Sequence, residues 1–155
     1  MALAVTPNPK NATTTLHGKS ERKTMNLSKI FAKKPESKKV IVADDVATIR
    51  TIVTSVFKKA KYQTFEARNG DEVLSLARTH NPQLIVLDLQ MGSRGGMSAI
   101  DELLLDDDLK RIPVVVLSGE KDPKLIEQVK AKKNVTDYII KDHLPNVISS
   151  LEKHV

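Results

Sequence analysis

Apolar residues from Lys39 onward follow two alternating patterns. Continuous apolar runs at 40–43, 84–87 and 114–117 are typical of strands buried on both faces, and residues 62–67 and 138–140 predict two further strands. Between these runs, apolar residues recur every three or four positions, which predicts amphipathic helices. The five helical segments are marked by Ile49, Ile52, Val53, Val56 and Phe57; by Val73, Leu74 and Ala77; by Ile100, Leu103 and Leu104; by Ile126 and Val129; and by Val147, Ile148 and Leu151.

Short polar signals separate these segments. Asn69-Gly70 predicts a turn, and Asp122-Pro123 predicts a helix N-cap followed by proline at the first helical position. Strands that alternate with helices predict an α/β fold with parallel strands and right-handed crossovers. We therefore expect residues 39–155 to form a doubly wound five-stranded parallel sheet with five helices. In such sheets the chemistry lies at the carboxyl ends of the strands.

The charge of the chain is concentrated in its first segment. Residues 1–38 carry eight basic and two acidic residues, whereas residues 39–155 carry seventeen of each. Thr, Asn, Pro, Ser and Lys dominate residues 1–38, which predicts a disordered basic tail. Leu27, Ile30 and Phe31 are spaced for one helical turn within it, and Met25 is an alternative start. The tail leaves open a weak, salt-sensitive contact with nucleic acid through Lys33, Lys34, Lys38 and Lys39, but we do not expect nucleic acid as the main partner.

Other broad classes are excluded by composition. The chain has no cysteine, so disulfides and thiolate metal sites are excluded, and a reducing, cytoplasmic setting fits. No stretch approaches the roughly 20 apolar residues that span a bilayer. The apolar residues at 1–5 lack a preceding basic residue, which argues against a secretory signal. Because only 3% of residues are aromatic, we expect a core built mainly from Val, Ile, Leu and Ala.

Polar residues with related chemistry stand directly after four of the predicted strands. These residues are Asp44 and Asp45, Asp88, Ser118 and Lys141. Three carboxylates at one rim repel one another unless a cation joins them, and Mg²⁺ prefers oxygen ligands. A hydroxyl and an ammonium group are the donors expected around a phosphoryl group. Taken singly, each residue has a plainer explanation, such as a helix terminus, a turn or a solvated charge. Together they predict a metal-assisted phosphoryl site with a carboxylate nucleophile.

These motifs resemble the receiver domains of two-component response regulators, and the resemblance covers about residues 39–155. It is carried by Val-Ile-Val-Ala-Asp-Asp at 40–45, by Leu-Ile-Val-Leu-Asp-Leu-Gln-Met at 84–91, by Ile-Pro-Val-Val-Val-Leu-Ser-Gly at 112–119 and by Asp-Tyr-Ile-Ile-Lys at 137–141. The resemblance implies the flavodoxin-like strand order 2-1-3-4-5. It also implies that Asp88 accepts a phosphoryl group from a phosphohistidine on a histidine kinase or histidine phosphotransfer protein.

The same resemblance implies how the site is completed. Asp45 and Asp88 would ligate Mg²⁺ directly, Asp44 would do so partly through water, and the backbone carbonyl of Gln90 would complete the set. Lys141 would pair with the phosphoryl oxygens. Ser118 would move to hydrogen-bond them, and Tyr138 would turn inward as a switch residue. The domain would be a switch rather than an enzyme, although it catalyses its own phosphorylation and dephosphorylation.

Two positions depart from the family pattern. Gly92 and Asp142 both stand where the family usually has proline, so the loop after Met91 is expected to be more mobile. The family's peptide bond after Lys141 is often cis, but cis costs about 2.5–4 kcal/mol before a residue other than proline, which predicts trans here. Gln90 and Glu120 occupy positions that tune hydrolysis of the aspartyl phosphate in the family.

The sequence leaves open two alternative functions and the identity of the downstream target. A phosphatase of the haloacid-dehalogenase type would need a second aspartate as general acid at the position of Gln90. A pseudo-receiver would keep the fold and act as an adaptor without phosphorylation. The downstream protein target is expected to contact residues 122–153, the fourth helix, fifth strand and fifth helix, and its identity is open.

Overall fold

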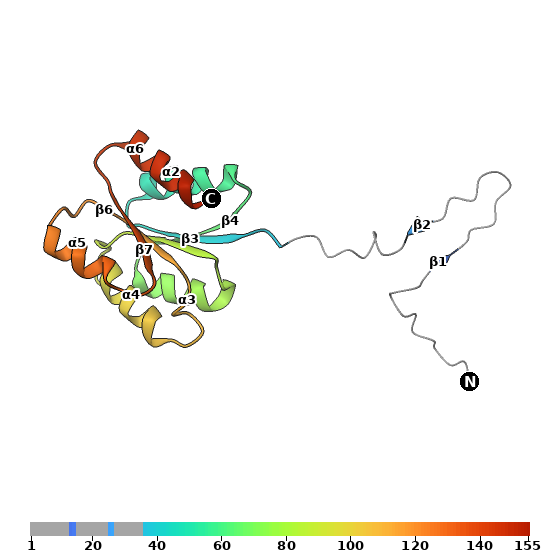
Figure 1. Cartoon of the computed structure of the whole chain (residues 1–155), viewed down its shortest axis with the longest axis horizontal. Coiled ribbons are helices and arrows are strands. Elements are labelled where there is room, and N and C mark those ends of the chain that lie inside the picture. Colours follow the sequence, from blue (N-terminus) through green and yellow to red (C-terminus); the bar gives the residue numbers. More distant parts are fainter. Residues whose placement is uncertain (1–12, 15–24, 27–35) are drawn as a thin grey trace. The chain divides into compact units, whose positions relative to one another are not determined.

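The computed structural model describes residues 13–14, 25–26 and 36–155. Strands β1 (Thr13–Thr14) and β2 (Met25–Asn26) pair antiparallel. The predictions for the rest of residues 1–35, which include the helical turn at 27–31 and the contacts of Lys33 and Lys34, lie outside the described residues. Ser37–Val155 forms one compact unit, which contains a five-stranded sheet (Figure 1).

The five strands of this sheet are β3 (Lys39–Ala43), β4 (Gln63–Ala67), β5 (Leu84–Leu87), β6 (Val114–Ser118) and β7 (Val135–Ile140). They run parallel in the order β4-β3-β5-β6-β7, which confirms the predicted 2-1-3-4-5 order. The three apolar runs form the central strands β3, β5 and β6, because a central strand is covered on both faces. β4 and β7 form the edges.

Helices cover both faces of the sheet (Figure 1). Val40 and Val42 pack on one face with residues of α2 and α6, including Phe57, whereas Ile41 and Ala43 pack on the other face with residues of α3, α4 and α5. This alternation follows from the two-residue period of a strand. The helices are α2 (Ala47–Lys59), α3 (Gly70–His80), α4 (Gly96–Leu105), α5 (Pro123–Lys130) and α6 (Leu144–Leu151), followed by the short helix η1 (Glu152–His154).

Polar caps fix the starts of two helices. Asp122 accepts a hydrogen bond from the backbone N–H of Lys124, and Pro123 is the first residue of α5, as predicted. Asn69-Gly70 is not a separate turn, because the Asn69 side chain accepts from the N–H of Glu72 and caps α3 directly. The prediction that the last strand begins at Tyr138 was also wrong. β7 begins at Val135, and the polar residues in its first half reflect its position at the edge of the sheet.

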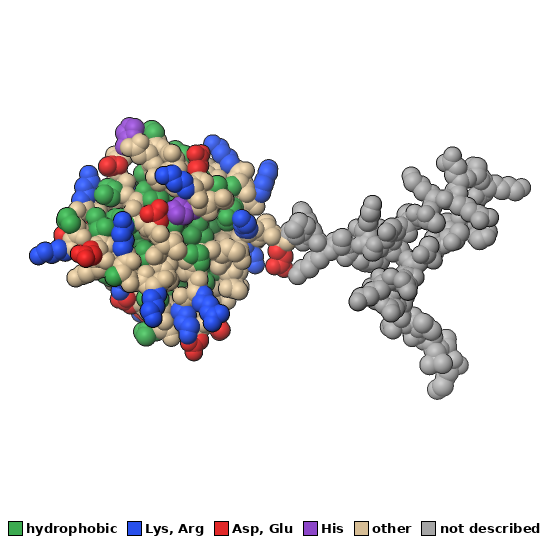
Figure 2. Space-filling model, in the orientation of Figure 1, with side chains coloured by type: hydrophobic (Ala, Val, Ile, Leu, Met, Phe, Trp, Pro, Cys, Tyr) green, Lys and Arg blue, Asp and Glu red, His purple; other side chains and the backbone are tan. Residues whose placement is uncertain are grey.

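Surface charge on the compact unit is mixed. Figure 2 shows basic and acidic side chains interspersed over the visible face. This distribution agrees with the equal numbers of basic and acidic residues in 39–155. Within the described part of the chain, no helix has the length and apolar character required to cross a membrane.

Candidate functional site

The ends of β3 and β5 bring three carboxyl groups together. These strands are neighbours, and the N–H of Asp88 donates to the carbonyl of Ala43 at 2.9 Å, so the residues that follow each strand meet. Asp44, Asp45 and Asp88 each place a carboxylate oxygen within 4.8 Å of the others. Asp44 and Asp88 are buried, with 2% and 5% of their surface exposed, whereas Asp45 is exposed. The predicted acidic cluster is therefore present, with one face open.

Lys141 brings a cation to this cluster from the end of β7. Its backbone N–H donates to the carbonyl of Ser118 at 2.9 Å, which places it beside the end of β6. Its Nζ lies 2.8 Å from Oδ2 of Asp88 and also contacts Oδ2 of Asp44. The residues predicted from separate strand ends thus share one site, and the ammonium bridges two of its carboxylates.

Burial and charge act against each other within this group. Burial raises the pKa of Asp44, and the nearby charge of Asp88 adds to this, while the Lys141 ammonium and the Val46 N–H act in the lowering direction. For Lys141, burial acts to lower the pKa, but the hydrogen bonds to Asp44 and Asp88 outweigh it and the pKa is raised. Lys141 therefore stays cationic at neutral pH. A buried ammonium with two carboxylate partners is the kind of group that also binds a phosphoryl oxygen.

Ser118 and Tyr138 are linked through the loop that follows β6. Ser118 is fully buried, and its Oγ accepts from the N–H of Glu120 at 3.3 Å. The Tyr138 hydroxyl donates to the carbonyl of Glu120 at 3.0 Å, and Tyr138 is buried. Burial raises the pKa of Tyr138, while a hydrogen bond with Ser118 acts in the opposite direction. The carboxylate of Glu120 accepts from the N–H groups of Lys121 and Asp122 and so stabilises its own loop.

The loop after β5 has glycine at position 92, where the family usually has proline. Gly92 has φ +50°, a left-handed conformation that proline cannot adopt because its ring holds φ near −65°. The loop is also anchored by Arg94, whose guanidinium pairs with Asp71 of α3 and Glu102 of α4. These contacts oppose the mobility that was expected from glycine at position 92.

The remaining sequence predictions for the site have mixed outcomes. The described residues contain no cis peptide bond, so the bond between Lys141 and Asp142 is trans, as predicted. Asp142 is exposed, and the ion pairs of Lys141 are with Asp44 and Asp88. The N–H of Gln90 donates to Oδ1 of Asp88 at 3.2 Å, whereas the role of its carbonyl stays a prediction.

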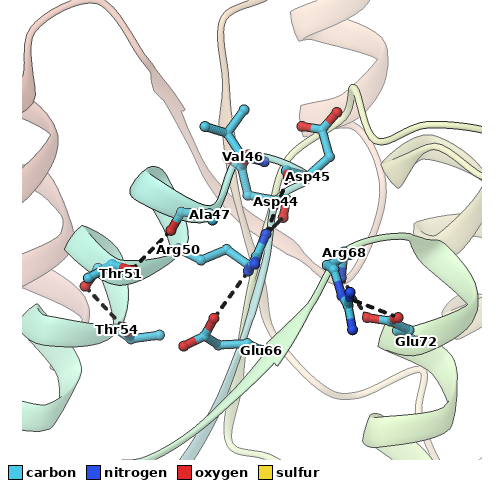
Figure 3. A network of polar contacts seen from close by, with 10 residues as sticks. All are labelled: Asp44, Asp45, Val46, Ala47, Arg50, Thr51, Thr54, Glu66, Arg68 and Glu72. Atoms are coloured by element: carbon cyan, nitrogen blue, oxygen red, sulfur yellow. Dashed lines mark hydrogen bonds and ion pairs between the residues drawn. The ribbon is translucent and has the colours of Figure 1, made fainter.

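Sequence reasoning missed Arg50, which lies in the first half of α2. Its Nη1 donates to the carbonyl oxygens of Asp44 and Asp45, and its Nε pairs with Glu66 of β4 (Figure 3). The available signal was a charged residue between the apolar positions 49 and 52 of an amphipathic helix. Such a residue is ordinarily read as solvated, and only the tertiary fold shows which carbonyl groups it reaches.

The donor set fits a hard divalent cation. Carboxylate oxygens are the preferred ligands of Mg²⁺, and this ion is bound through one or two carboxylates together with water and phosphate oxygens. Asp45 is exposed and available, while Asp44 and Asp88 are close enough to share a cation with it. The cluster therefore offers the oxygen ligands that a divalent cation requires.

Several known proteins resemble this chain in sequence or in fold. The chain is 30% identical over 118 residues to the chemotaxis protein CheY of Thermotoga maritima, covering 75% of this chain and 96% of that protein. It is 25% identical over 119 residues to the sporulation initiation phosphotransferase F of Bacillus subtilis, covering 77% and 94%. The crystal structure of the phosphorylated cyanobacterial phytochrome response regulator RcpA superimposes with a TM-score of 0.69 at 25% identity, covering 77% of this chain and 91% of that one.

A family model provides the most direct assignment. The model of the response regulator receiver domain matches residues 40–151, a span that contains all five strands of the sheet except Lys39 at the start of β3. The matched span also includes Asp44, Asp45, Asp88 and Lys141. This protein therefore belongs to the response regulator receiver domain family of two-component signalling.

Proposed function

We propose that this chain is a phosphorylation-dependent switch in which Asp88 accepts a phosphoryl group from a phosphohistidine. The observation that carries the proposal is the shared site of Asp88, the two acidic residues after β3 and the Lys141 ammonium 2.8 Å from Asp88. A histidine kinase or histidine phosphotransfer protein is the donor. This assignment suits the cytoplasm, where such donors obtain phosphoryl groups from ATP.

The transfer step uses groups that are already in place. A carboxylate oxygen of Asp88 forms a bond to phosphorus while the phosphorus–nitrogen bond of the phosphohistidine breaks, and the leaving imidazole takes up a proton. The Lys141 ammonium, which contacts Asp88, then forms an ion pair with the oxygens of the transferred phosphoryl group. In hydrolysis, a water oxygen bonds to phosphorus, the bond to Asp88 breaks and inorganic phosphate leaves.

Mg²⁺ is the proposed cofactor. Asp44, Asp45 and Asp88 would hold it together with the Gln90 backbone carbonyl. When bound, it neutralises charge on the phosphoryl oxygens. The carboxylates then supply position and charge, while the N–H of Gln90, 3.2 Å from Oδ1 of Asp88, helps to orient the acceptor.

The contacts of Glu120 suggest how the signal leaves the site. The Ser118 hydroxyl accepts a hydrogen bond from the Glu120 N–H, and the Tyr138 hydroxyl donates one to the Glu120 carbonyl. A shift of Ser118 toward a phosphoryl oxygen would therefore displace the loop that Tyr138 also contacts. The same loop leads into α5, in which only Val129 is buried. Leu125 and Ile126 are partly buried against the core, and a helix held by so few side chains can move at modest cost. We therefore propose that a downstream protein binds the surface formed by residues 122–153.

An apolar cleft beside Lys141 supports docking of the phosphodonor at this end of the sheet. The cleft has a volume of about 210 Å³. Val46 and Leu144, at the starts of α2 and α6, are about half exposed and add apolar surface nearby. The cleft is lined by Ile49, Ile52, Val53, Leu117, Lys141, Asp142, His143, Leu144 and Val147.

Phosphorylation by acetyl phosphate tests the proposed function. Intact-protein mass spectrometry is expected to show one added phosphoryl group when the protein is incubated with acetyl phosphate and Mg²⁺. The group is expected to be lost in Asp88→Asn and when EDTA replaces Mg²⁺. Asp108→Asn is the matched control, because it removes an exposed carboxylate from the loop after α4 and is expected to phosphorylate normally. An unmodified wild-type protein, or equal modification of Asp88→Asn, would reject the proposal and favour an adaptor.

A further inference from the structure

Arg50 makes a set of contacts that the phosphoryl chemistry does not by itself require. Its Nη1 lies 2.8 Å from the carbonyl oxygen of Asp44 and 3.3 Å from that of Asp45. Its Nε lies 3.1 Å from Oε2 of Glu66. Figure 3 shows the guanidinium between the acidic pair and the edge strand β4. One side chain from α2 therefore joins the end of β3 to β4.

The burial of this group makes its contacts informative. Only 12% of the Arg50 side chain is exposed, whereas 44% of Glu66 is exposed. A largely buried guanidinium is held in one geometry, because its planar fork of donors must be satisfied. Two backbone carbonyls and one carboxylate provide that satisfaction here. Neither carbonyl belongs to a strand or helix, since β3 ends at Ala43 and α2 begins at Ala47.

The main chain and the side chain of Asp44 are fixed by different partners. Arg50 donates a hydrogen bond to the backbone carbonyl of Asp44, while Oδ1 of Asp44 accepts one from the N–H of Val46 at 2.9 Å. Asp45 accepts the longer bond from Arg50 at its carbonyl, and its carboxylate is exposed. The path of the chain through both acidic residues thus depends on Arg50.

We propose that Arg50 is a positioning residue that holds Asp44 and Asp45 in the arrangement that binds Mg²⁺. The inference rests on the proposed function, because it assumes that the acidic cluster is a Mg²⁺ site. Arg50 acts through the backbone of the ligands and does not contact the metal or the phosphoryl group. Contacts of this kind typically change metal affinity by about 10- to 100-fold when they are removed.

The charge of Arg50 and its contacts predict opposite changes in Mg²⁺ affinity when the side chain is replaced. A positive charge near a cation site weakens cation binding, so its removal alone would tighten Mg²⁺ binding. Loss of positioning has the opposite effect, because two carbonyls lose their donor and the acidic residues become free to move. The proposal predicts weaker binding in Arg50→Met, so a purely electrostatic role gives a result of opposite direction.

Three variants separate these effects. Arg50→Met removes both the charge and the contacts, whereas Arg50→Lys keeps the charge and loses the fork of donors. Arg68→Met is the matched control, because it removes the same charge from a side chain that is 73% exposed and forms an ion pair with Glu72, 3.7 Å away (Figure 3). The full chain is titrated with MgCl₂, and the backbone amide NMR shifts of residues 44–46 and 88–90 report the Kd. Thermal melts without Mg²⁺ show that each variant is folded.

The expected result is a Kd for Mg²⁺ raised about tenfold in Arg50→Met, raised to a smaller extent in Arg50→Lys and unchanged in Arg68→Met. The Mg²⁺ concentration that gives half-maximal phosphorylation by acetyl phosphate should rise in parallel, with the plateau rate recovered at saturating Mg²⁺. A structural role alone would lower the melting temperature and leave the Kd of the folded protein unchanged. If Arg50→Met does not fold, Arg50→Lys decides the question.

The outcomes distinguish this inference from the proposed function. If the wild-type protein binds no Mg²⁺ and takes up no phosphoryl group, the proposed function and the role of Arg50 both fail. If the wild-type protein does both, and the Arg50 variants bind Mg²⁺ as tightly or more tightly, only the role of Arg50 is overturned.

Discussion

Replacing Gly96 with alanine tests how closely α4 approaches the phosphoacceptor. A Cβ at Gly96 would overlap the carbonyl oxygen of Asp88 and lie 2.9 Å from both the carbonyl carbon of Asp88 and the Cα of Leu89. All three are backbone atoms, so no side-chain rotation relieves the overlap. Because Gly96 is also the first residue of α4, the substitution must move the helix start or the Asp88 backbone.

The size of the effect follows from two opposing contributions. Overpacking in a close-packed interior costs about 1–3 kcal/mol, and backbone atoms place this contact at the upper end. Alanine lowers the entropy of the unfolded chain relative to glycine, which returns about 0.4–1 kcal/mol. We therefore expect the free energy of unfolding to fall by about 2 kcal/mol. With a urea m-value of about 2 kcal/mol/M, the midpoint moves down by about 1 M.

Urea unfolding followed by far-UV circular dichroism measures this change. Gly119→Ala is the matched control, because no atom lies within 4 Å of its added Cβ and its φ is outside the left-handed region. The control is expected to be as stable as the wild type or slightly more stable. Gly96→Ala within about 0.2 M of the wild-type midpoint, or an equal loss in Gly119→Ala, would show that close approach to Asp88 is not what requires glycine.

Two further predictions concern the edges of the site. Burial acts to raise the pKa of Asp137, but hydrogen bonds from His154 and the Tyr138 N–H outweigh it and hold the pKa below the ordinary value of 3.8. Because the folded pKa is depressed, the stabilisation is present above pH 3.8 and is lost as the pH falls through the folded pKa. In urea unfolding, the free energy of unfolding of the wild type should exceed that of Asp137→Asn by less than about 1 kcal/mol at neutral pH, and the difference should disappear in acid. A difference that does not change with pH would contradict this. Arg94→Ala is expected to speed hydrogen exchange of the amides at 92–95, since the loop loses its ion pairs with α3 and α4; unchanged exchange there would show that these ion pairs are not what orders the loop.

Positions 92 and 142, where the family usually has proline, show how such a difference in sequence affects the structure. From the sequence, the missing prolines predicted a more mobile loop after Met91 and a trans peptide bond after Lys141. At position 92 the backbone adopts a left-handed φ that excludes proline, and Arg94 supplies an anchor in its place. At position 142 the trans bond still lets Lys141 reach Asp44 and Asp88. The consequences of a missing proline depended on contacts from other parts of the chain.

Much of this protein was determined by local sequence. The apolar runs specified the three central strands because a strand buried on both faces leaves no room for polar residues. Parallel topology then required the residues that follow those apolar runs to share one rim: Asp44, Asp45, Asp88 and Ser118, the last of which ends β6. The edge strand β7 was predicted three residues too short, because an edge admits polar side chains and weakens the pattern.

The tertiary structure decided what contacts the acidic residues make. Arg50 resembles any charged residue on a helix in the sequence, and its role depends on how α2 packs against the ends of β3 and β4. Tyr138 and Ser118 are linked through Glu120 because the Tyr138 hydroxyl, from β7, reaches the loop that follows β6. Strand pattern and strand-end chemistry are local properties of the chain. The orientation of a side chain toward carbonyls far away in sequence depends on packing, and no local pattern encodes it.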